Sequence, residues 1–566
     1  MKNELVIRDG LIVDGTGQPG YQGDISIRDG KLIQVGGKAE KGLREINASG
    51  AIVTPGFVDI HTHYDGQVTW DPILASSSLH GVTTAVMGNC GIGFAPVRVQ
   101  DREWLVGLME AVEDIPADTL NAGLPWEWES ITEYMAFLEK QNRVIDIGVQ
   151  ATHASIRTYV MGERGAANET ATEGDIRQMA QLVQEAMSGG ALGFTSSRST
   201  LQRTNEGKHT PGYGIPVDEL FALGSVLGRM NKGTIGLNVD FDDIDREIEW
   251  LRQLRKITNR PVWFLLAQFP DVPDKYRTIL ERIGEASRQG EPLTAQVAGR
   301  PVGFLLGLES TKHPFVSRPS YRAIANLPLK ERVQRLHDPK FREQLLSETV
   351  RHNSVIMRSI TERFDLMFRL GDPPDYEPSK EKSIAAIAAS QGRNPAEVAL
   401  DTLLERDGRE LLFMPGANYA RGDFSDIDVM LSDPNTVLGL SDAGAHCGLV
   451  CDSSMPTFML AHWARDRSRG PKRSLESVVA SQTSKTASFM GLGDRGVLKP
   501  GYKADINVID FQKLTLRAPT MDYDLPAGGR RLMQKSQGYI STVVSGVVVA
   551  ENDQLTGERP GKLIRQ

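Results

Sequence analysis

The sequence predicts an α/β protein: a (β/α)8 barrel of the TIM type, with a small β-sandwich built from both chain ends and a long insertion between barrel strands 7 and 8. Two observations lead to this fold class. In the middle of the 566-residue chain, short apolar runs alternate with helix-like stretches, which is the pattern of βα units. Both ends are instead rich in short strands and turn residues, as in "ELVIRDGLIVDG" near the start and "YISTVVSGVVVAEN" near the end.

The strand-rich ends are expected to form one composite domain, because they share the same texture and flank an α/β middle. We assign residues 1–55 and 486–566 to this β-sandwich and residues 56–485 to the barrel. Asp-Gly pairs between alternating apolar residues, as in "RDGLIV" and "RDGKLI", predict hairpins in its N-terminal half.

Eight candidate barrel strands can be counted along the middle of the chain. They cover residues 57–61, 83–88, 147–153, 192–196, 234–239, 262–268, 294–298 and 436–441. About 135 residues separate the seventh from the eighth, far more than one helix needs. We therefore expect residues 301–435 to be an insertion over the barrel mouth.

Composition and charge exclude several classes of partner. The net charge is −8 and there is no basic stripe, so a nucleic-acid partner is not expected. No apolar run reaches the roughly 18 residues that a membrane span needs. The three cysteines and the absence of a secretory leader at the start predict reduced thiols and a cytoplasmic protein. The sequence leaves self-association open.

The pair His61 and His63 is the most specific chemical feature. It ends the first predicted strand, and residues two apart on a strand point to the same face. Both imidazoles can therefore reach one metal ion, and a chance pair on a surface loop is the competing interpretation.

Other polar residues follow further strands at the same end of the predicted barrel. Cys90 follows the second strand, His153 ends the third, and Asp442 follows the eighth. Barrel enzymes place their active sites at this end of the strands. Each residue also has a structural interpretation: a buried thiol in a Gly-rich turn for Cys90, a turn or cap for Asp442, and a loop anchor for His153.

Several segments together resemble a known family. They are "TPGFVDIHTHYD" (54–65), "GVTTAVMGNCGIGFAP" (81–96), "GGALGFTSS" (189–197), "GLSDAGAHCG" (439–448) and "DRGVLKPGYKADINVID" (494–510). In this order they resemble the amidohydrolase superfamily, and within it the N-acyl-D-amino-acid deacylase, or D-aminoacylase-like, branch. The likeness runs along nearly the whole chain.

The resemblance implies a metal-dependent hydrolase that cleaves the C–N amide bond of an N-acyl-D-amino acid or a related small amide with metal-activated water. It implies Zn²⁺ or another divalent metal on His61, His63, Cys90 and Asp442. Asp442 would accept a proton from the water and pass it to the leaving amine.

The sequence departs from the deacylases at two positions. Those enzymes use a histidine after the fifth strand and another after the sixth, but this chain has no histidine in residues 211–312. Asn238, Asp240 and Gln268 stand there instead, and amides replace imidazole poorly as zinc ligands. We therefore expect one metal ion per chain.

Further residues are candidates for catalysis or substrate binding. His153 and His446 could replace a missing ligand, polarise the carbonyl or bond the oxyanion. The expected substrate contacts come from two arginines that can bind a carboxylate and two amides, namely Arg198, Arg300, Asn238 and Gln268.

Two alternatives to deacylation remain. One is another hydrolase of the superfamily that acts on a cyclic amide, a lactone or another non-standard amide, which the missing histidines keep open. The other is a non-catalytic barrel that serves as a scaffold. Retention of His61, His63 and Asp442 together favours an enzyme.

Overall fold

Both chain ends meet in one β-sheet in the computed structural model, which describes residues 2–566. The sheet has nine strands in the order β25-β24-β23-β18-β5-β1-β2-β3, with β4 paired to β1. The antiparallel pair β5–β18 joins the N-terminal strands to the C-terminal ones. The strands are β1 (Asn3–Ile12), β2 (Tyr21–Arg28), β3 (Lys31–Val35), β4 (Gly42–Asn47), β5 (Ile52–Pro55), β18 (Ile506–Ile509), β23 (Tyr539–Val544), β24 (Val547–Glu551) and β25 (Gln554–Leu555).

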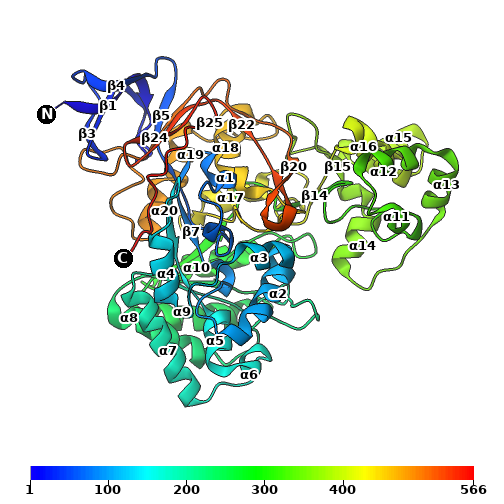
Figure 1. The fold of residues 1–566 in the computed structure, drawn as a ribbon, viewed down its shortest axis with the longest axis horizontal. Helices are drawn as coiled ribbons and strands as arrows, with labels where there is room; N and C mark the ends of the chain where they lie inside the picture. The colour runs from blue at the N-terminus through cyan, green and yellow to red at the C-terminus, as the bar shows by residue number, and fades with distance from the viewer. Residues whose placement is uncertain (1) are drawn as a thin grey trace.

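This terminal sheet has its own apolar core. Alternating residues of β1 and β2, such as Leu5, Ile7 and Ile25, pack against Val508 and Val543 from the other chain end. The alternation follows from the two-residue repeat of a strand, which turns successive side chains to opposite faces. Figure 1 shows the N-terminal strands and the C-terminal strands together at one end of the molecule.

The middle of the chain forms a series of parallel strands. Their pairing gives the orders β6-β7-β8 and β9-β10-β11-β12-β13-β17. Only Gln150 separates β8 from β9, and a parallel bridge between Thr62 and Ala443 connects the chain after β6 with the chain after β17. The strands are β6 (Phe57–Asp59), β7 (Val82–Met87), β8 (Asp146–Val149), β9 (Ala151–Thr152), β10 (Gly193–Ser197), β11 (Thr234–Asn238), β12 (Val262–Leu265), β13 (Leu293–Val297) and β17 (Thr436–Leu438).

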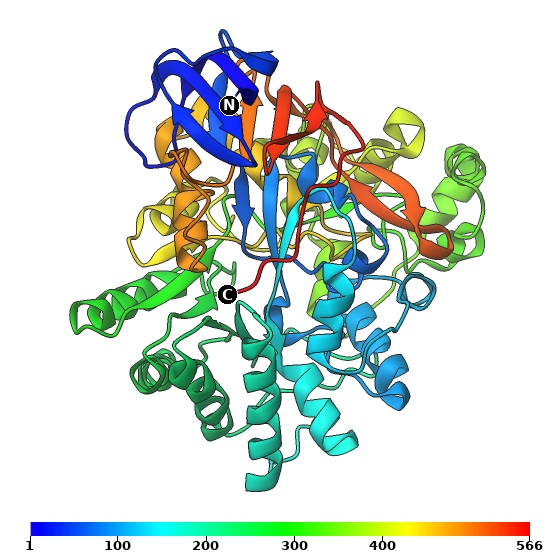
Figure 2. The same ribbon diagram turned by 60° about the vertical axis from the view of Figure 1, so that its left-hand side comes forward.

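Each of the eight predicted strand positions contains one of these strands, the third in two pieces. The strands are buried along nearly their whole length, which explains their continuous apolar runs. Helices follow them on the outside (Figure 2). The larger ones are α2 (Arg102–Glu113), α4 (Ile131–Glu139), α5 (His153–Met161), α7 (Glu173–Ser188), α8 (Val217–Met230), α9 (Ile244–Thr258), α10 (Lys275–Arg288), α19 (Leu475–Ser481) and α20 (Ser484–Phe489).

Local sequence explains where these helices begin and which face they bury. Ser130 and Thr172 each close a capping box, with Glu133 and Asp175 respectively, at the starts of α4 and α7. Along α9, buried residues recur three or four positions apart, as an amphipathic helix on a sheet requires.

The insertion after β13 forms a separate helical lobe. Its three-stranded sheet, in the order β14-β16-β15, lies at the base, and the lobe has its own apolar core. In Figure 1 the helices project to one side of the barrel strands. The elements are β14 (Gly303–Leu306), α11 (Pro319–Ile324), α12 (Leu329–His337), α13 (Pro339–Ser347), α14 (Val355–Glu362), β15 (Phe368–Arg369), α15 (Ile384–Gln391), α16 (Pro395–Gly408) and β16 (Leu412–Pro415). The next helix, α17 (Ser425–Ser432), packs instead into the main core beside the barrel strands.

The C-terminal segment ties the terminal sheet to the barrel strands. Bridges join Arg143 to Gly561 and Ile147 to Leu563, so the last residues run beside β8, as Figure 2 shows. The hairpin β20 (Thr520–Leu525) and β21 (Gly529–Met533) precedes this segment. Within residues 2–566, every helix is too short or too polar to span a bilayer.

Candidate metal centre

The chain just after β6 presents His61 and His63 at the end of the parallel strands. The His61 amide donates to Asp59 Oδ1 at 3.1 Å, and the His63 amide donates to the Ala443 carbonyl at 2.8 Å. Both imidazoles are buried, and their ring centroids lie 5.3 Å apart. The backbone pairing therefore holds both side chains in one place, as the two-residue spacing predicted.

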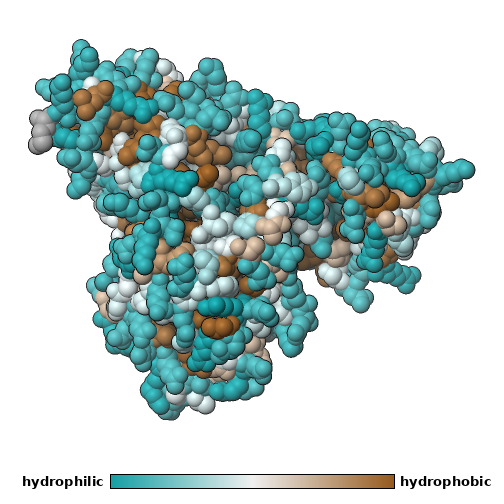
Figure 3. All heavy atoms as spheres, viewed as in Figure 1, coloured by the Kyte–Doolittle hydropathy of each residue, from teal (hydrophilic) through white to brown (hydrophobic). Residues whose placement is uncertain are grey.

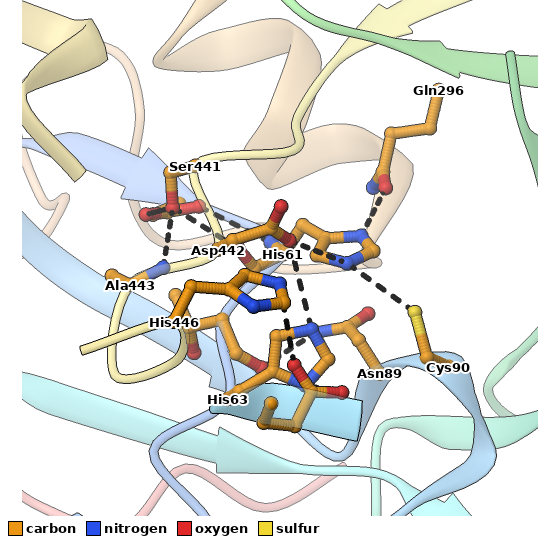
Figure 4. A network of polar contacts seen from close by, with 12 residues as sticks. His61, His63, Asn89, Cys90, Gln296, Ser441, Asp442, Ala443 and His446 are labelled. Carbon is orange, nitrogen blue, oxygen red and sulfur yellow. Dashed lines mark hydrogen bonds and ion pairs between the residues drawn. The ribbon is translucent and has the colours of Figure 1, made fainter. Parts of the chain in front are cut away.

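Cys90 completes a cluster of three possible metal ligands. One ligand atom each from His61, His63 and Cys90 lies within 4.8 Å of the others, and Cys90 Sγ is 3.7 Å from His61 Nε2. Cys90 follows β7 in a turn where its φ is +54° and that of Gly88 is +83°. Such left-handed backbone is uncommon for a non-glycine residue and is typical of functional sites. Figure 4 shows the thiol pointing towards the imidazoles.

Asp442 approaches the same cluster from the loop after β17. Its Oδ1 lies 3.2 Å from His61 Nε2 and 3.6 Å from His63 Nε2. Asp442 also has a positive φ, +49°, as do Leu440 at +62° and His446 at +51°. The loop therefore bends repeatedly to turn the carboxylate towards both imidazoles, as Figure 4 shows.

Two residues at the centre were missed by the sequence analysis. Gln296 of β13 accepts a hydrogen bond from His61 Nδ1 at 2.5 Å. Glu113, the last residue of α2, is 2% exposed and lies 3.5 Å from His63 Nδ1. A polar residue inside the buried strand "LTAQV" could have pointed to Gln296, but nothing in the local sequence distinguishes Glu113 from other helical glutamates.

Electrostatics couple the groups of the cluster. Burial opposes ionisation of Asp442, but hydrogen bonds from His61 and His63 outweigh it and hold its pKa well below the usual range. Burial likewise disfavours the His61 imidazolium, but Asp442 and Cys90 raise the His61 pKa to about 10. For Cys90, the two imidazoles overcome burial and lower the thiol pKa. Asp442 and Cys90 therefore favour their anionic forms, which positive charge at the imidazoles stabilises.

The predicted histidines differ in their surroundings. His446 lies beside the centre, where its Nε2 is 3.7 Å from Glu113 Oε2 and its side chain is 30% exposed. His153 is not part of the cluster, because both ring nitrogens are taken by protein partners. Its Nδ1 is 2.7 Å from Ser196 Oγ, and its Nε2 donates to Glu219 Oε1 at 2.9 Å.

Of the predicted substrate contacts, Arg300 and Gln268 are enclosed by protein. Arg300 is fully buried, pairs with Asp452 at 2.9 Å and also donates to Ser454. The side-chain nitrogen of Gln268 donates to Asp426, and its side-chain oxygen accepts from the backbone amide of Ala420. Their polar atoms satisfy the interior of the fold, so neither side chain is free to bind a substrate in this conformation.

Arg198 and Asn238 lie closer to open space. The Arg198 guanidinium donates to the Ile215 carbonyl at 2.7 Å and lies over the Trp250 ring at 5.7 Å. Asn238 ends β11 and lines a cavity of about 600 Å³. Asp442 lines the same cavity, which therefore opens directly onto the candidate metal centre. Of the insertion, Val302 and Ala417 line it.

Comparison with known proteins agrees with this geometry. A sequence profile of the amidohydrolase family matches residues 44–550. The chain belongs to the amidohydrolase family. A D-aminoacylase of Alcaligenes xylosoxydans xylosoxydans is 24% identical over 99% of this chain and 97% of its own. An N-acyl-D-aspartate deacylase of the same organism is also 24% identical, over 99% and 95%.

Solved structures agree in fold. A crystal structure of D-aminoacylase covers both chains completely, with 21% identity and a TM-score of 0.65. The N-acyl-D-glutamate deacylase of Bordetella bronchiseptica, complexed with zinc and a phosphonate inhibitor, covers both completely with 22% identity and a TM-score of 0.66. These relatives place the chain in the D-aminoacylase-like branch, as a metal-dependent amidohydrolase.

The residues of this amidohydrolase fit a divalent cation. The donor set combines imidazole nitrogens, a thiol of lowered pKa and a carboxylate, which are the ligand types that zinc prefers. Neighbouring anionic groups raise the pKa of both imidazoles, so the space between these side chains favours a positive charge, which a divalent cation would supply. Buried His63 Nδ1 has no hydrogen-bond partner among residues 2–566 and faces Glu113, which could accept its proton.

Proposed function

We propose that this amidohydrolase cleaves the C–N amide bond of an N-acyl-D-amino acid or a related small amide, with one divalent metal ion, zinc or a similar metal, on His61, His63, Cys90 and Asp442. The observation that carries the proposal is the convergence of these four side chains beside a cavity of about 600 Å³ that Asp442 lines. The relatives named D-aminoacylase and N-acyl-D-aspartate deacylase support this substrate class.

We infer that the parallel strands close into a (β/α)8 barrel and that the terminal sheet folds over its own core as a sandwich. The Thr62–Ala443 bridge supports closure, because it joins the ends of the first and eighth strands. The assignment of residues 1–55 and 486–566 to one domain is supported by the pairing of β5 with β18. Barrel closure would bring all strand ends to one face, where the metal ligands lie.

A divalent ion at this centre supplies Lewis acidity to the amide carbonyl and to water. Asp442 accepts a proton from the attacking water and delivers it to the leaving nitrogen, so cleavage yields a carboxylic acid and a free amine. Its place in the cavity wall gives the carboxylate access to both the water and the amide.

The other residues of the centre orient the metal-binding imidazoles or contact the substrate. Gln296 accepts the His61 Nδ1 proton, which leaves the Nε2 lone pair facing Asp442 and Cys90. Glu113 Oε1 lies 3.5 Å from His63 Nδ1, where it can accept the proton of that nitrogen once the imidazole binds metal, and Glu113 Oε2 faces His446. His446 is half-buried beside the cluster, and its imidazole can donate to the developing oxyanion. His153 acts through Ser196 and Glu219 as a support of the strand ends.

We further propose that the protein works in the cytoplasm. All three cysteines are free and buried, which suits a reducing compartment.

The test of the proposed function is hydrolysis by the full-length, metal-loaded protein. N-acetyl-D- and N-acetyl-L-amino acids are incubated with it, and the released free amino acids are quantified. We expect release from D-substrates, loss of activity with a chelator and recovery on adding zinc. Activity that persists in the chelator, or hydrolysis of lactones and cyclic amides only, would contradict the proposal.

A further inference from the structure

The cavity at Asp442 has a largely apolar wall. Side chains from the ends of β11 and β12 and from the loops that follow them line it, including Phe241, Leu266 and Phe269. A wall of this kind favours a ligand group that leaves water without losing hydrogen bonds.

Apolar side chains also form the rim of this cavity. Leu201, Phe269 and Val272 line it and are 66%, 42% and 45% exposed. The Phe269–Val272 bridge fixes two of them in one tight turn. On the face shown in Figure 3, apolar residues form only small separate patches in a mainly hydrophilic surface. Three exposed apolar side chains around one opening indicate a surface that a ligand covers.

The charged groups of the cavity wall are few and mainly negative. Among residues 2–566, Lys275 is the one cationic side chain that lines it, beside Asp240, Asp242 and Asp271. Lys275 Nζ donates to the Asp240 carbonyl at 2.7 Å and lies 4.0 Å from the exposed Asp242 carboxylate, beyond hydrogen-bond distance, so two of its three protons are left for another acceptor. Asp240 is held by hydroxyl and amide donors and has no cationic partner there: its oxygens accept from Ser199 and Thr200.

This charge pattern limits how many anionic groups a substrate can place in the cavity. One carboxylate can pair with the Lys275 ammonium. A second would face the Asp240, Asp242 and Asp271 carboxylates without a cation, and this repulsion is unfavourable. Neither Arg198 nor Arg300 lines this space.

Building on the proposed function, we propose that the substrate of this site is a monoanion with a neutral, apolar group. Lys275 holds its single carboxylate, and the apolar group fills the wall between Phe241 and Phe269. An acidic amino-acid side chain, as in the N-acyl-D-aspartate and N-acyl-D-glutamate substrates for which two relatives are named, does not fit this charge pattern. The apolar group comes from the amino-acid side chain or from the acyl chain.

The deciding experiment compares substrates on the full-length, metal-loaded enzyme. N-acetyl-D-leucine and N-acetyl-D-phenylalanine present an apolar side chain, N-octanoyl-D-alanine presents an apolar acyl chain, and N-acetyl-D-aspartate and N-acetyl-D-glutamate present a second carboxylate. We expect kcat/KM at least about tenfold higher for one of the apolar sets than for the acidic pair. Equal or higher kcat/KM for the acidic pair would overturn the proposal.

Binding of the same compounds, measured by calorimetry, separates this inference from the proposed function. If none is hydrolysed but the apolar compounds bind at least about tenfold more tightly, the substrate-class inference stands and deacylation fails. If the acidic compounds bind as tightly, or none binds, the inference fails whatever the rate of hydrolysis.

Two variants locate the effect. Val272→Asp places a charge at the rim, and Val355→Asp places one on α14 at an exposed valine outside the cavity. We expect Val272→Asp to raise KM for the preferred apolar substrate at least about tenfold and Val355→Asp to leave it unchanged. Equal effects of the two variants would contradict a substrate site at this wall.

The role of Lys275 is tested by comparing a substrate that has a carboxylate with the matching amide that lacks one. Lys275→Met should raise KM for the preferred N-acyl amino acid at least about tenfold but leave KM for the matching amide, which has no carboxylate, unchanged; Lys275→Arg should restore binding. An equal loss for acid and amide would show that Lys275 supports the fold instead.

Discussion

Asp442 combines strain and charge in one residue. Its φ of +49° costs backbone free energy, and its carboxylate, whose side chain is 15% exposed, lies beside two imidazoles. Asp442→Asn keeps the shape but removes the proton acceptor. We expect kcat to fall roughly 10³-fold or more, with little change in KM, because proton transfer develops only in the transition state.

Steady-state kinetics and metal analysis of the purified Asp442→Asn variant check this prediction together. Metal content near that of the wild type would assign the loss to proton transfer. A variant that keeps a tenth or more of the wild-type rate would show that another base does this work.

Cys90 differs from the other two cysteines in its electrostatics. Burial raises the pKa of Cys447 and of Cys451 to about 12, whereas the imidazoles lower that of Cys90. If Cys90 binds metal, chelation should expose it to alkylation while Cys447 and Cys451 change less. Mass spectrometry of alkylated peptides, with and without chelator, measures this.

A matched variant tests the same residue without chemical labelling. Cys90→Ala should lower metal affinity, whereas Cys447→Ala, at another buried thiol, should change only thermal stability. Unchanged metal content in Cys90→Ala, with equal alkylation in both states, would assign Cys90 to the fold.

Glu113 is expected to act on the metal centre through His63. Glu113→Gln keeps the size of the side chain but weakens the acceptor at His63 Nδ1, so metal affinity should fall by roughly 10–100-fold. Glu103→Gln, on the exposed face of the same helix, is the control. Metal titration and melting temperature are measured together. A lower melting temperature with unchanged affinity would show a purely structural role.

At the scale of elements, the ends of β11 and β12 decide how many metal ions can bind. The Asp240 carboxylate, just after β11, accepts from Ser199 and Thr200, and Gln268 Oε1, after β12, accepts from the Ala420 amide. These oxygen atoms are engaged by the protein, so a second ion would lack ligands. We expect about one tightly bound divalent ion per chain.

Elemental analysis of protein purified after metal-limited growth measures this stoichiometry. Two equivalents would mean that the oxygen donors after β11 or β12 exchange their protein partners for metal.

At the scale of the whole molecule, His80 joins distant parts of the chain. Its Nδ1 is 2.9 Å from Thr457 Oγ1, and its Nε2 donates to the Gln534 carbonyl at 2.9 Å. Burial lowers the His80 pKa to about 4, against an ordinary value of 6.5. Between pH 6.5 and 4, His80 is therefore protonated in the unfolded chain but stays neutral in the folded protein.

Because the unfolded chain binds this extra proton, the free energy of unfolding falls as the pH is lowered. The contribution of neutral His80 is fully present above pH 6.5 and is lost as the pH falls towards 4. The loss amounts to about 3 kcal/mol at most. His80→Gln should flatten the fall in the free energy of unfolding over this range, whereas His337→Gln, at an exposed site, should not. Urea unfolding at several pH values measures it, and parallel curves for all three proteins would refute the assignment.

Much of the architecture could be predicted from the sequence, because it follows from the local spacing of apolar residues. Buried parallel strands appear as short apolar runs, so all eight strand positions could be counted. The excess length between β13 and β17 predicted an insertion, but the sequence did not predict the direction in which this helical lobe projects. The direction of a lobe depends on packing at its base, where Val302 and Ala417 line the cavity, and local sequence does not encode that packing.

By itself, the sequence determined the parts of the site that adjacent residues define. His61 and His63 share a face because of strand geometry, and Cys90 and Asp442 follow strands that end on the same side. Only the tertiary structure decided which distant side chains join them. It brought Gln296 and Glu113 to the imidazoles and enclosed Arg300 and Gln268 in the interior. Contacts between residues far apart in sequence depend on how helices and strands pack, and no local pattern records that packing.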